Sequence, residues 1–252
     1  MTVTLAATLL LSVLIGLSLG LLGGGGSILT VPILTYVAGM SPREAIASSL
    51  FVVGVTSAFS AVRHARRGRV KWRTGLLFGA AGMAGAFGGG LLGGRIPGAV
   101  LMVAFALMMI ATSVAMIRGR RGGAVESHSK ELPVGKVIVE GLAVGLVTGL
   151  VGAGGGFLVV PALALLGGLS MPVAVGTSLV VISLKSFAGL SGYLTTVSLD
   201  WALVGSVTAA AIVGSLIGAR LVGRIPEAAL RRGFGFFVLG MGIFVLAMEL
   251  LP

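Results

Sequence analysis

The chain has 252 residues, of which 56% are hydrophobic and 10% charged, and its formal net charge is +11. Apolar stretches of about 20 residues recur along it, which predicts a polytopic, all-α membrane protein. Those stretches are apolar on every face, so the alternating strands of a β-barrel are excluded. The absence of cysteine excludes disulfides and thiolate metal sites. The positive residues gather in short loops, which is typical of cytoplasmic loops and not of a nucleic-acid surface.

The first half of the chain holds four long apolar segments, at residues 5–39, 42–62, 73–94 and 97–117. No basic n-region precedes the first, so we interpret it as part of the fold and not as a signal peptide. Gly23 to Gly26 interrupt it, and each glycine costs about 1 kcal/mol relative to alanine within a helix. We therefore expect two elements, Val3 to Leu22 and Ser27 to Val37, the second too short to cross a membrane.

The second half holds segments at residues 136–168, 172–195, 201–222 and 227–250. Its first segment should be broken in the same way, into Lys136 to Val151 and Gly156 to Leu166. We thus expect one integral membrane domain built from transmembrane repeat 1 (1–118), a cytoplasmic linker (119–135) and transmembrane repeat 2 (136–252), with five helical elements in each repeat.

The two halves are copies of one unit. Of the 82 positions from Gly16 to Pro97, 28 carry the same residue as the position 129 places later, without a gap. GLSLGLLGGGGSILTVPIL, from Gly16, returns as GLVTGLVGAGGGFLVVPAL, from Gly145. Shared membrane composition alone does not produce such an alignment, so we infer a duplication.

The charges of equivalent loops indicate that the copies are inverted. The loop from Arg63 to Arg73 has six Lys or Arg and no acid, whereas its counterpart, 192–202, has none and contains Asp200. Basic loops stay in the cytoplasm, so the two loops should lie on opposite sides, and an odd number of elements per copy is needed. Both termini are then expected outside. Trp72, Trp201 and Tyr193 are interpreted as interfacial anchors.

Each glycine break is followed by a new helix, with Ser27 suited to be an N-cap. Helix N-termini carry free N–H donors and favour anions, and unwound backbone in a bilayer must face protein or a wet cavity. We therefore expect an anion site built from Gly25, Gly26, Ser27, Gly154, Gly155 and Gly156. Close helix packing is the alternative role for these glycines, and it is the role expected of the small-xxx-small series Gly85/Gly89/Gly93, Gly141/Gly145/Gly149 and Gly214/Gly218.

Lys185 is the sharpest single residue, because it lies 14 positions into an apolar segment where the first copy has Thr56. A lysine buried in a membrane is costly and suggests function; snorkelling to the outer interface is the alternative. Ser49 and Ser178 occupy equivalent positions, where their hydroxyls can donate to an anion or bond back to the helix. We include Ser49, Ser178 and Lys185 in the candidate substrate site.

The doubled pattern of glycines and proline, Gly20 to Pro32 and Gly149 to Pro161, resembles the sulfite exporter TauE/SafE family, also described as the 4-toluene sulfonate uptake permease family. The resemblance covers nearly the whole chain, including its two-copy layout. It implies a transporter of sulfite, thiosulfate or organosulfonates in the bacterial cytoplasmic (inner) membrane, with no cofactor.

The leading hypothesis is a secondary transporter in which the two repeats rock about a central site that holds a small sulfur-containing anion. An anion-selective channel and a non-transport membrane scaffold are the alternatives. An intramembrane enzyme is disfavoured because no midplane His, Cys or paired carboxylates are visible. The expected partners are the anion and membrane lipids, without nucleic acid, and the glycine-rich faces permit a homodimer.

Overall fold

The computed structural model describes residues 2–22, 25–118, 134–152, 159–160, 163, 169, 171–221 and 227–250, and every regular element in these ranges is helical. The helices of the first copy are α1 (Thr2–Leu22), α3 (Pro42–Arg66), α4 (Trp72–Gly93) and α5 (Gly98–Arg118). Those of the second are α6 (Val134–Val151), α8 (Met171–Tyr193), α9 (Trp201–Leu221) and α10 (Glu227–Leu250). The all-α fold class predicted from the sequence is confirmed.

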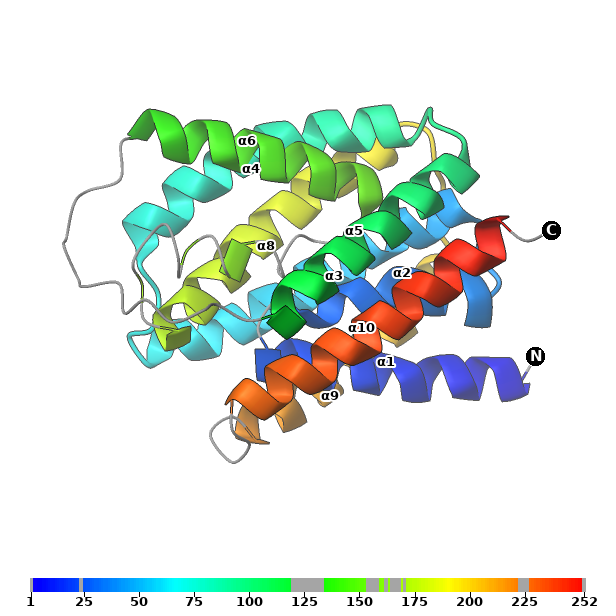
Figure 1. Cartoon of the computed structure of the whole chain (residues 1–252), viewed down its shortest axis with the longest axis horizontal. Helices are drawn as coiled ribbons and strands as arrows, with labels where there is room; N and C mark the ends of the chain where they lie inside the picture. Colours follow the sequence, from blue (N-terminus) through cyan, green and yellow to red (C-terminus); the bar gives the residue numbers. More distant parts are fainter. Residues whose placement is uncertain are drawn as a thin grey trace.

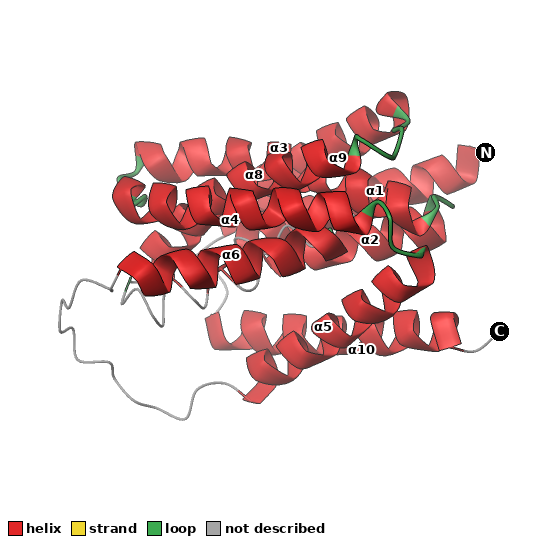
Figure 2. Ribbon diagram, turned by 90° about the horizontal axis from the view of Figure 1, so that it is seen from above, coloured by secondary structure: helices red, strands yellow, loops and turns green. Residues whose placement is uncertain are grey.

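Among the described helices, α1, α3, α4, α8 and α9 are long and apolar enough to cross a membrane. Within the span windows, 72% of α3 and 67% of α8 are buried inside the structure, against 44% or less for the other three. α3 and α8 are therefore the central pair of the bundle. Figure 2 shows α5 and α10 as a separate pair along one side of it.

Local sequence sets where the long helices begin. Ser41 and Glu44 form a capping box at the start of α3, with Ser41 Oγ 2.8 Å from a Glu44 carboxylate oxygen and Pro42 in the first helical position. At α9, the Asp200 carboxylate accepts the N–H groups of Ala202 and Leu203 at 3.0 and 3.1 Å. Each cap satisfies amides that have no partner within the helix.

The predicted break in the first apolar segment is confirmed, since α1 ends at Leu22 and a second helical stretch runs from Gly25 to Val37. This stretch is irregular: a 3-10 turn, Gly25–Leu29 (η1), a short α-helix, Thr30–Pro32 (α2), and a π-helical turn, Ile33–Val37 (η2). Ser27 lies inside the 3-10 turn, so its predicted N-cap role is wrong. The helical stretch begins two residues earlier than expected.

The equivalent break in the second copy begins at Gly152. Its φ of +68° is a left-handed conformation that favours glycine, and it ends α6 directly after Val151. A side chain here would also collide with α3, because a Cβ would lie 2.5 Å from Ile46 Cγ2. Gly154, Gly155 and Gly156 lie outside the described residues.

Most of the long helices pack against a helix of the other copy. α4 of the first copy packs on α6 of the second, and α9 of the second packs on α1 of the first. The pairs α3 with α8 and α5 with α10 each join equivalent helices. Neither copy therefore completes its own packing without the other.

The glycines at small-xxx-small spacing form the two exchanged interfaces, as predicted. On α4 and α6, Gly85 and Gly89 face the backbone of Leu142 and Leu146, and Gly145 faces the backbone of Gly82. The equivalent interface between α1 and α9 is formed by Gly16, Gly20, Gly214 and Gly218. At each of these positions a Cβ would collide with backbone, so the helix axes approach as closely as backbones allow.

Equivalent helices run in opposite directions. α3 and α8 are antiparallel, because Leu50 lies against Gly189 whereas His64, further along α3, lies against Gly176. Figure 1 shows the same reversal for α1 with α6 and for α5 with α10. The start of α1 and the end of α10 consequently lie at the same end of the bundle (Figure 1).

Two neighbouring glycines on α4 provide a matched test of this packing. Gly89→Ala places a Cβ 2.7 Å from the Leu150 nitrogen on α6, whereas Gly88 has no atom within 4 Å of its would-be Cβ. We expect Gly89→Ala to destabilise the protein by about 1–3 kcal/mol through overpacking. Gly88→Ala should be neutral or stabilise it by up to about 1 kcal/mol through helix propensity.

Thermal unfolding of the two purified variants in detergent measures the difference. Equal melting temperatures for Gly88→Ala and Gly89→Ala would show that the α4–α6 backbones are not in close contact.

Candidate functional site

The antiparallel pairing of α3 and α8 brings equivalent positions of the two copies to one level at its midpoint. Gly54 lies against Ser186, with 3.3 Å between a would-be Cβ and the Ser186 Cβ. Thr56 and Lys185, which are equivalent in sequence, stand at this midpoint. A charged residue in one copy and an uncharged residue in the other therefore stand at the centre of the bundle.

Lys185 extends into the junction of three helices. Its side chain is 1% exposed, and its stem runs over Gly82 of α4, where a Cβ would lie 2.8 Å from Lys185 Cδ. Its Nζ donates to the Thr148 hydroxyl of α6 at 3.3 Å. The Thr148 hydroxyl in turn donates to the Val144 carbonyl at 2.7 Å. Gly82 thus provides the space for the lysine stem, and Thr148 holds its amine.

The amine of Lys185 has no carboxylate partner among the described residues. A neutral hydroxyl compensates little of the cost of bringing an ammonium group out of water, and an unpaired buried charge costs several kcal/mol. An anion entering this junction would remove that cost.

Buried hydroxyls without a hydrogen-bond partner among the described residues accompany Lys185. Ser57 on α3 and Ser186 on α8 are equivalent, fully buried and unpartnered, and so is Thr56. Ser48 and Thr30 share the same properties. Because an unsatisfied buried polar group costs about 1–3 kcal/mol, a polar ligand that reached these hydroxyls would remove part of that cost.

The two predicted serines are differently engaged. Ser49 Oγ lies 2.6 Å from the Gly152 carbonyl, at the end of α6, and 2.9 Å from the Ile46 carbonyl. Ser178 donates back to the Val175 carbonyl of its own helix at 2.8 Å. Ser49 therefore ties the second glycine segment to α3, whereas Ser178 bonds within α8.

The helical stretch that follows the first glycine segment is held against the same central helix. Ser27 is fully buried, and the stretch that begins at Gly25 packs on α1 and, through α2, on α3. The interaction of Ser49 with Gly152 brings the beginning of the second glycine segment to α3 as well. α3 is thus contacted by the helical stretch after the first break and by Gly152 at the second.

Thr148 and Gly82 were missed by the sequence analysis. Both stand where the other copy has a different residue, since Leu19 is equivalent to Thr148 and Ala211 to Gly82. A search for polar residues of one copy whose equivalent in the other copy is apolar would have found Thr148, because its equivalent is Leu19. The duplicated sequence therefore contained the signal.

One anchor prediction is wrong. Trp72 and Trp201 are 55% and 53% exposed, as interfacial anchors should be, but Tyr193 is fully buried. Its hydroxyl donates to the Leu150 carbonyl at 2.5 Å, and its ring lies against Gly93. Tyr193 therefore fastens the end of α8 to α4 and α6.

Comparison with known proteins places this architecture in a family. The family model for the sulfite exporter TauE/SafE matches residues 8–245. A probable membrane transporter protein of Xylella fastidiosa (strain 9a5c) is 34% identical, over 92% of this chain and 91% of its own length. Others come from Methanocaldococcus jannaschii, 32% identical over 73% and 72%, and from Bacillus subtilis (strain 168), 26% identical over 88% and 92%.

No solved structure matches the chain significantly. The family match covers both repeats, both glycine breaks and the central helices α3 and α8. A multi-pass helical bundle with polar groups buried at its centre agrees with the names of the relatives. The chain belongs to the sulfite exporter TauE/SafE family of membrane transporters.

Proposed function

We propose that the protein is a secondary transporter that moves sulfite, thiosulfate or an organosulfonate across the bacterial cytoplasmic membrane by alternating access. The observation that carries this proposal is Lys185, a fully buried amine whose partner among the described residues is one neutral hydroxyl at 3.3 Å. A small anion neutralises it, and an oxyanion also accepts hydrogen bonds from the hydroxyls around it. The family match supports the sulfur-containing class.

In this proposal the anion meets Lys185 and the unpartnered hydroxyls of Thr56, Ser57 and Ser186, near the midpoint of α3 and α8. Backbone N–H groups at Gly25, Gly26 and Ser27, and at Gly154, Gly155 and Gly156, complete the site from the two breaks. Ser49 and Ser178 join it by exchanging their present carbonyl partners for the anion. The N-terminal ends of discontinuous helices near the midplane are the usual anion sites of such transporters.

Alternating access is supported by the way in which helices of one copy pack against helices of the other. Equivalent helices run in opposite directions, which is the arrangement that inverted repeats produce. The bundle has one end that holds the N-terminus of the chain and an opposite end. Around α3, α4 and α9 the basic residues gather at the opposite end, whereas the end with the N-terminus has Arg43 and Arg95. The basic residues of the opposite end are Arg63, Arg66, Arg67, Arg69, Lys71, Arg73 and Arg220. By the positive-inside rule the opposite end is cytoplasmic and both termini are outside.

Replacement of Lys185 tests the site. Saturable uptake of radiolabelled sulfite, thiosulfate and sulfoacetate is measured in proteoliposomes. We expect Lys185→Met to lower uptake of the transported anion at least 30-fold, because loss of a buried charged partner costs about 2 kcal/mol or more. Lys71→Met, which removes an exposed lysine in a loop, is the matched control and should transport normally. Full saturable uptake by Lys185→Met would exclude the proposed site.

The same substitution makes a second prediction, about stability. Methionine fills a similar volume without an amine to desolvate, and replacing buried charges by apolar groups is often stabilising by 1–4 kcal/mol. We expect Lys185→Met to melt at the same temperature as the wild type or higher in detergent. A marked fall in melting temperature would mean that Lys185 is a structural residue and that its loss of transport reports misfolding.

Counterflow separates the carrier from the anion channel. Unlabelled substrate inside the vesicles, at the same concentration as the substrate outside, should accelerate uptake of the labelled substrate. The reason is that a carrier reorients to the outside with an unlabelled substrate molecule bound. Channel conduction far above carrier turnover, without counterflow, would contradict alternating access.

Cysteine labelling tests the topology, and the chain has no native cysteine to interfere. Arg67 and Thr196 are exposed just beyond the ends of α3 and α8. In spheroplasts, a membrane-impermeant maleimide should label Thr196→Cys and leave Arg67→Cys unlabelled until the cells are permeabilised. Labelling of both variants from the outside would exclude inverted repeats.

A further inference from the structure

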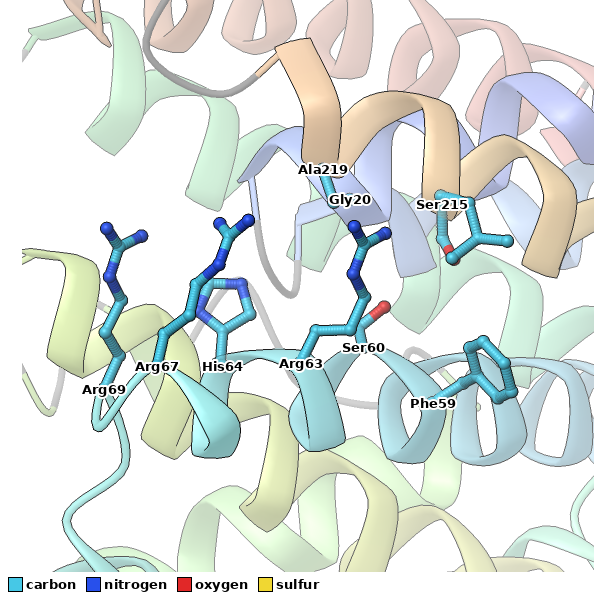
Figure 3. A pocket seen from close by; sticks show the side chains of 10 residues that line it. Gly20, Phe59, Ser60, Arg63, His64, Arg67, Arg69, Ser215 and Ala219 are labelled. Atoms are coloured by element: carbon cyan, nitrogen blue, oxygen red, sulfur yellow. The ribbon is translucent and has the colours of Figure 1, made fainter.

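A hollow opens between the last turns of α3 and the packed pair of α1 and α9 (Figure 3). Its enclosed volume is small, about 20 Å³, and the space between its walls is partly open to solvent. α3 contributes Ser60, Arg63 and His64 to its wall, the loop after α3 contributes Arg67 and Arg69, and α9 contributes Ser215. The side chains of Arg63, Arg67 and Arg69 extend from the end of α3 and the loop after it toward the side on which α1 and α9 lie (Figure 3).

The equivalent place in the other copy is closed. There Gly192 stands for Arg63 and Tyr193 for His64. Gly192 lets α8 lie directly on α4, since a Cβ would be 2.7 Å from the Phe87 carbonyl oxygen, and the Tyr193 hydroxyl reaches the Leu150 carbonyl. The hollow therefore exists because the first copy has an arginine and a shorter ring at these two positions.

The wall of the hollow is cationic and without counter-charge. Among the described residues no carboxylate forms an ion pair with Arg63, Arg67 or Arg69. The Nδ1 atom of His64 is buried there without a hydrogen-bond partner in the same set of residues. Three guanidinium groups and a free imidazole nitrogen match the several oxygens of a phosphate group.

The side of the hollow away from Arg69 is apolar and open to the surroundings. Phe59 lines it and is 48% exposed, and Leu216 of α9 lines it opposite. Val62 and Ile217, next to them on the same helices, are also exposed. A ligand that suits this hollow has an anionic head and an apolar tail, and the hollow lies at the ends of two spanning helices, where a membrane places such molecules.

We propose that this hollow binds an anionic phospholipid, with the headgroup phosphate held by Arg63, Arg67 and Arg69 and the acyl chain along Phe59 and Leu216. The site is separate from Lys185 and independent of the transport proposal. The bound lipid lies where α3 meets the α1–α9 pair. At the equivalent place in the other copy, α8 packs directly on α4.

Binding is measured by native mass spectrometry of the delipidated, full-length protein in detergent, titrated with dioleoylphosphatidylglycerol or dioleoylphosphatidylcholine. We expect one phosphatidylglycerol to bind preferentially. Each of Arg63→Gln, Arg67→Gln and Arg69→Gln should weaken it about five-fold, the effect of one cation near a lipid headgroup. Arg118→Gln, an exposed arginine at the end of α5, is the charge-matched control and should leave binding unchanged.

A variant that carries the second copy's residues at the hollow keeps the binding test independent of folding defects. Arg63→Gly with His64→Tyr carries the residues of the second copy, so it should close the hollow, abolish the phosphatidylglycerol preference and keep the wild-type melting temperature. Retention of that preference by this folded variant, or by the triple glutamine variant, would overturn the proposal.

Soluble anions distinguish the lipid from a free phosphate. Inorganic phosphate and sn-glycerol 3-phosphate, at the lipid concentrations used, should neither bind measurably nor raise the melting temperature. If either stabilises the wild type as strongly as phosphatidylglycerol does, and Arg63→Gln removes that effect, the hollow is a soluble-anion site and the lipid assignment is wrong. Equal binding of the two lipids would also contradict it.

Discussion

Backbone contact between helices of different copies is the constraint on which this structure depends. In a bilayer, apolar side chains gain little by leaving lipid for one another, so close backbone approach and dispersion must hold the helices together. Gly85, Gly89 and Gly145 let α4 and α6 meet in this way, and their equivalents Gly214, Gly218 and Gly16 do so for α9 and α1. Because each interface joins the two copies, the protein is one interlocked bundle.

The exchange leaves α3 and α8 at the centre, and these two helices carry most of the buried polar residues in the described part of the chain. Lys185 fits there because Gly82 makes room for its stem and Thr148 accepts from its amine. A bundle selected only for stability would fill this junction with apolar side chains. The buried amine and the unpartnered hydroxyls of Ser57 and Ser186 on these helices are the observations from which we propose a bound anion.

Much of this was predictable from the sequence, for identifiable physical reasons. The offset of 129 residues fixed the equivalent helices, and the cost of consecutive glycines placed the end of α1 at Leu22. The lateral order of helices was not predictable, because spans that are apolar on every face do not show which neighbour they contact. The direction of individual side chains could not be predicted from the sequence either, since Tyr193 is buried. The exact start of the second helical stretch was also not predictable, because the turn that contains Ser27 begins at Gly25.

The central claim is that the buried amine of Lys185 binds the substrate. It is tested most directly by equilibrium binding of radiolabelled sulfite, thiosulfate and sulfoacetate to the purified protein, without transport. For one of these anions the wild type should show a saturable site, competed by the unlabelled anion, that is lost in Lys185→Met and retained in Lys71→Met. Equal saturable binding by wild type and Lys185→Met would contradict the account.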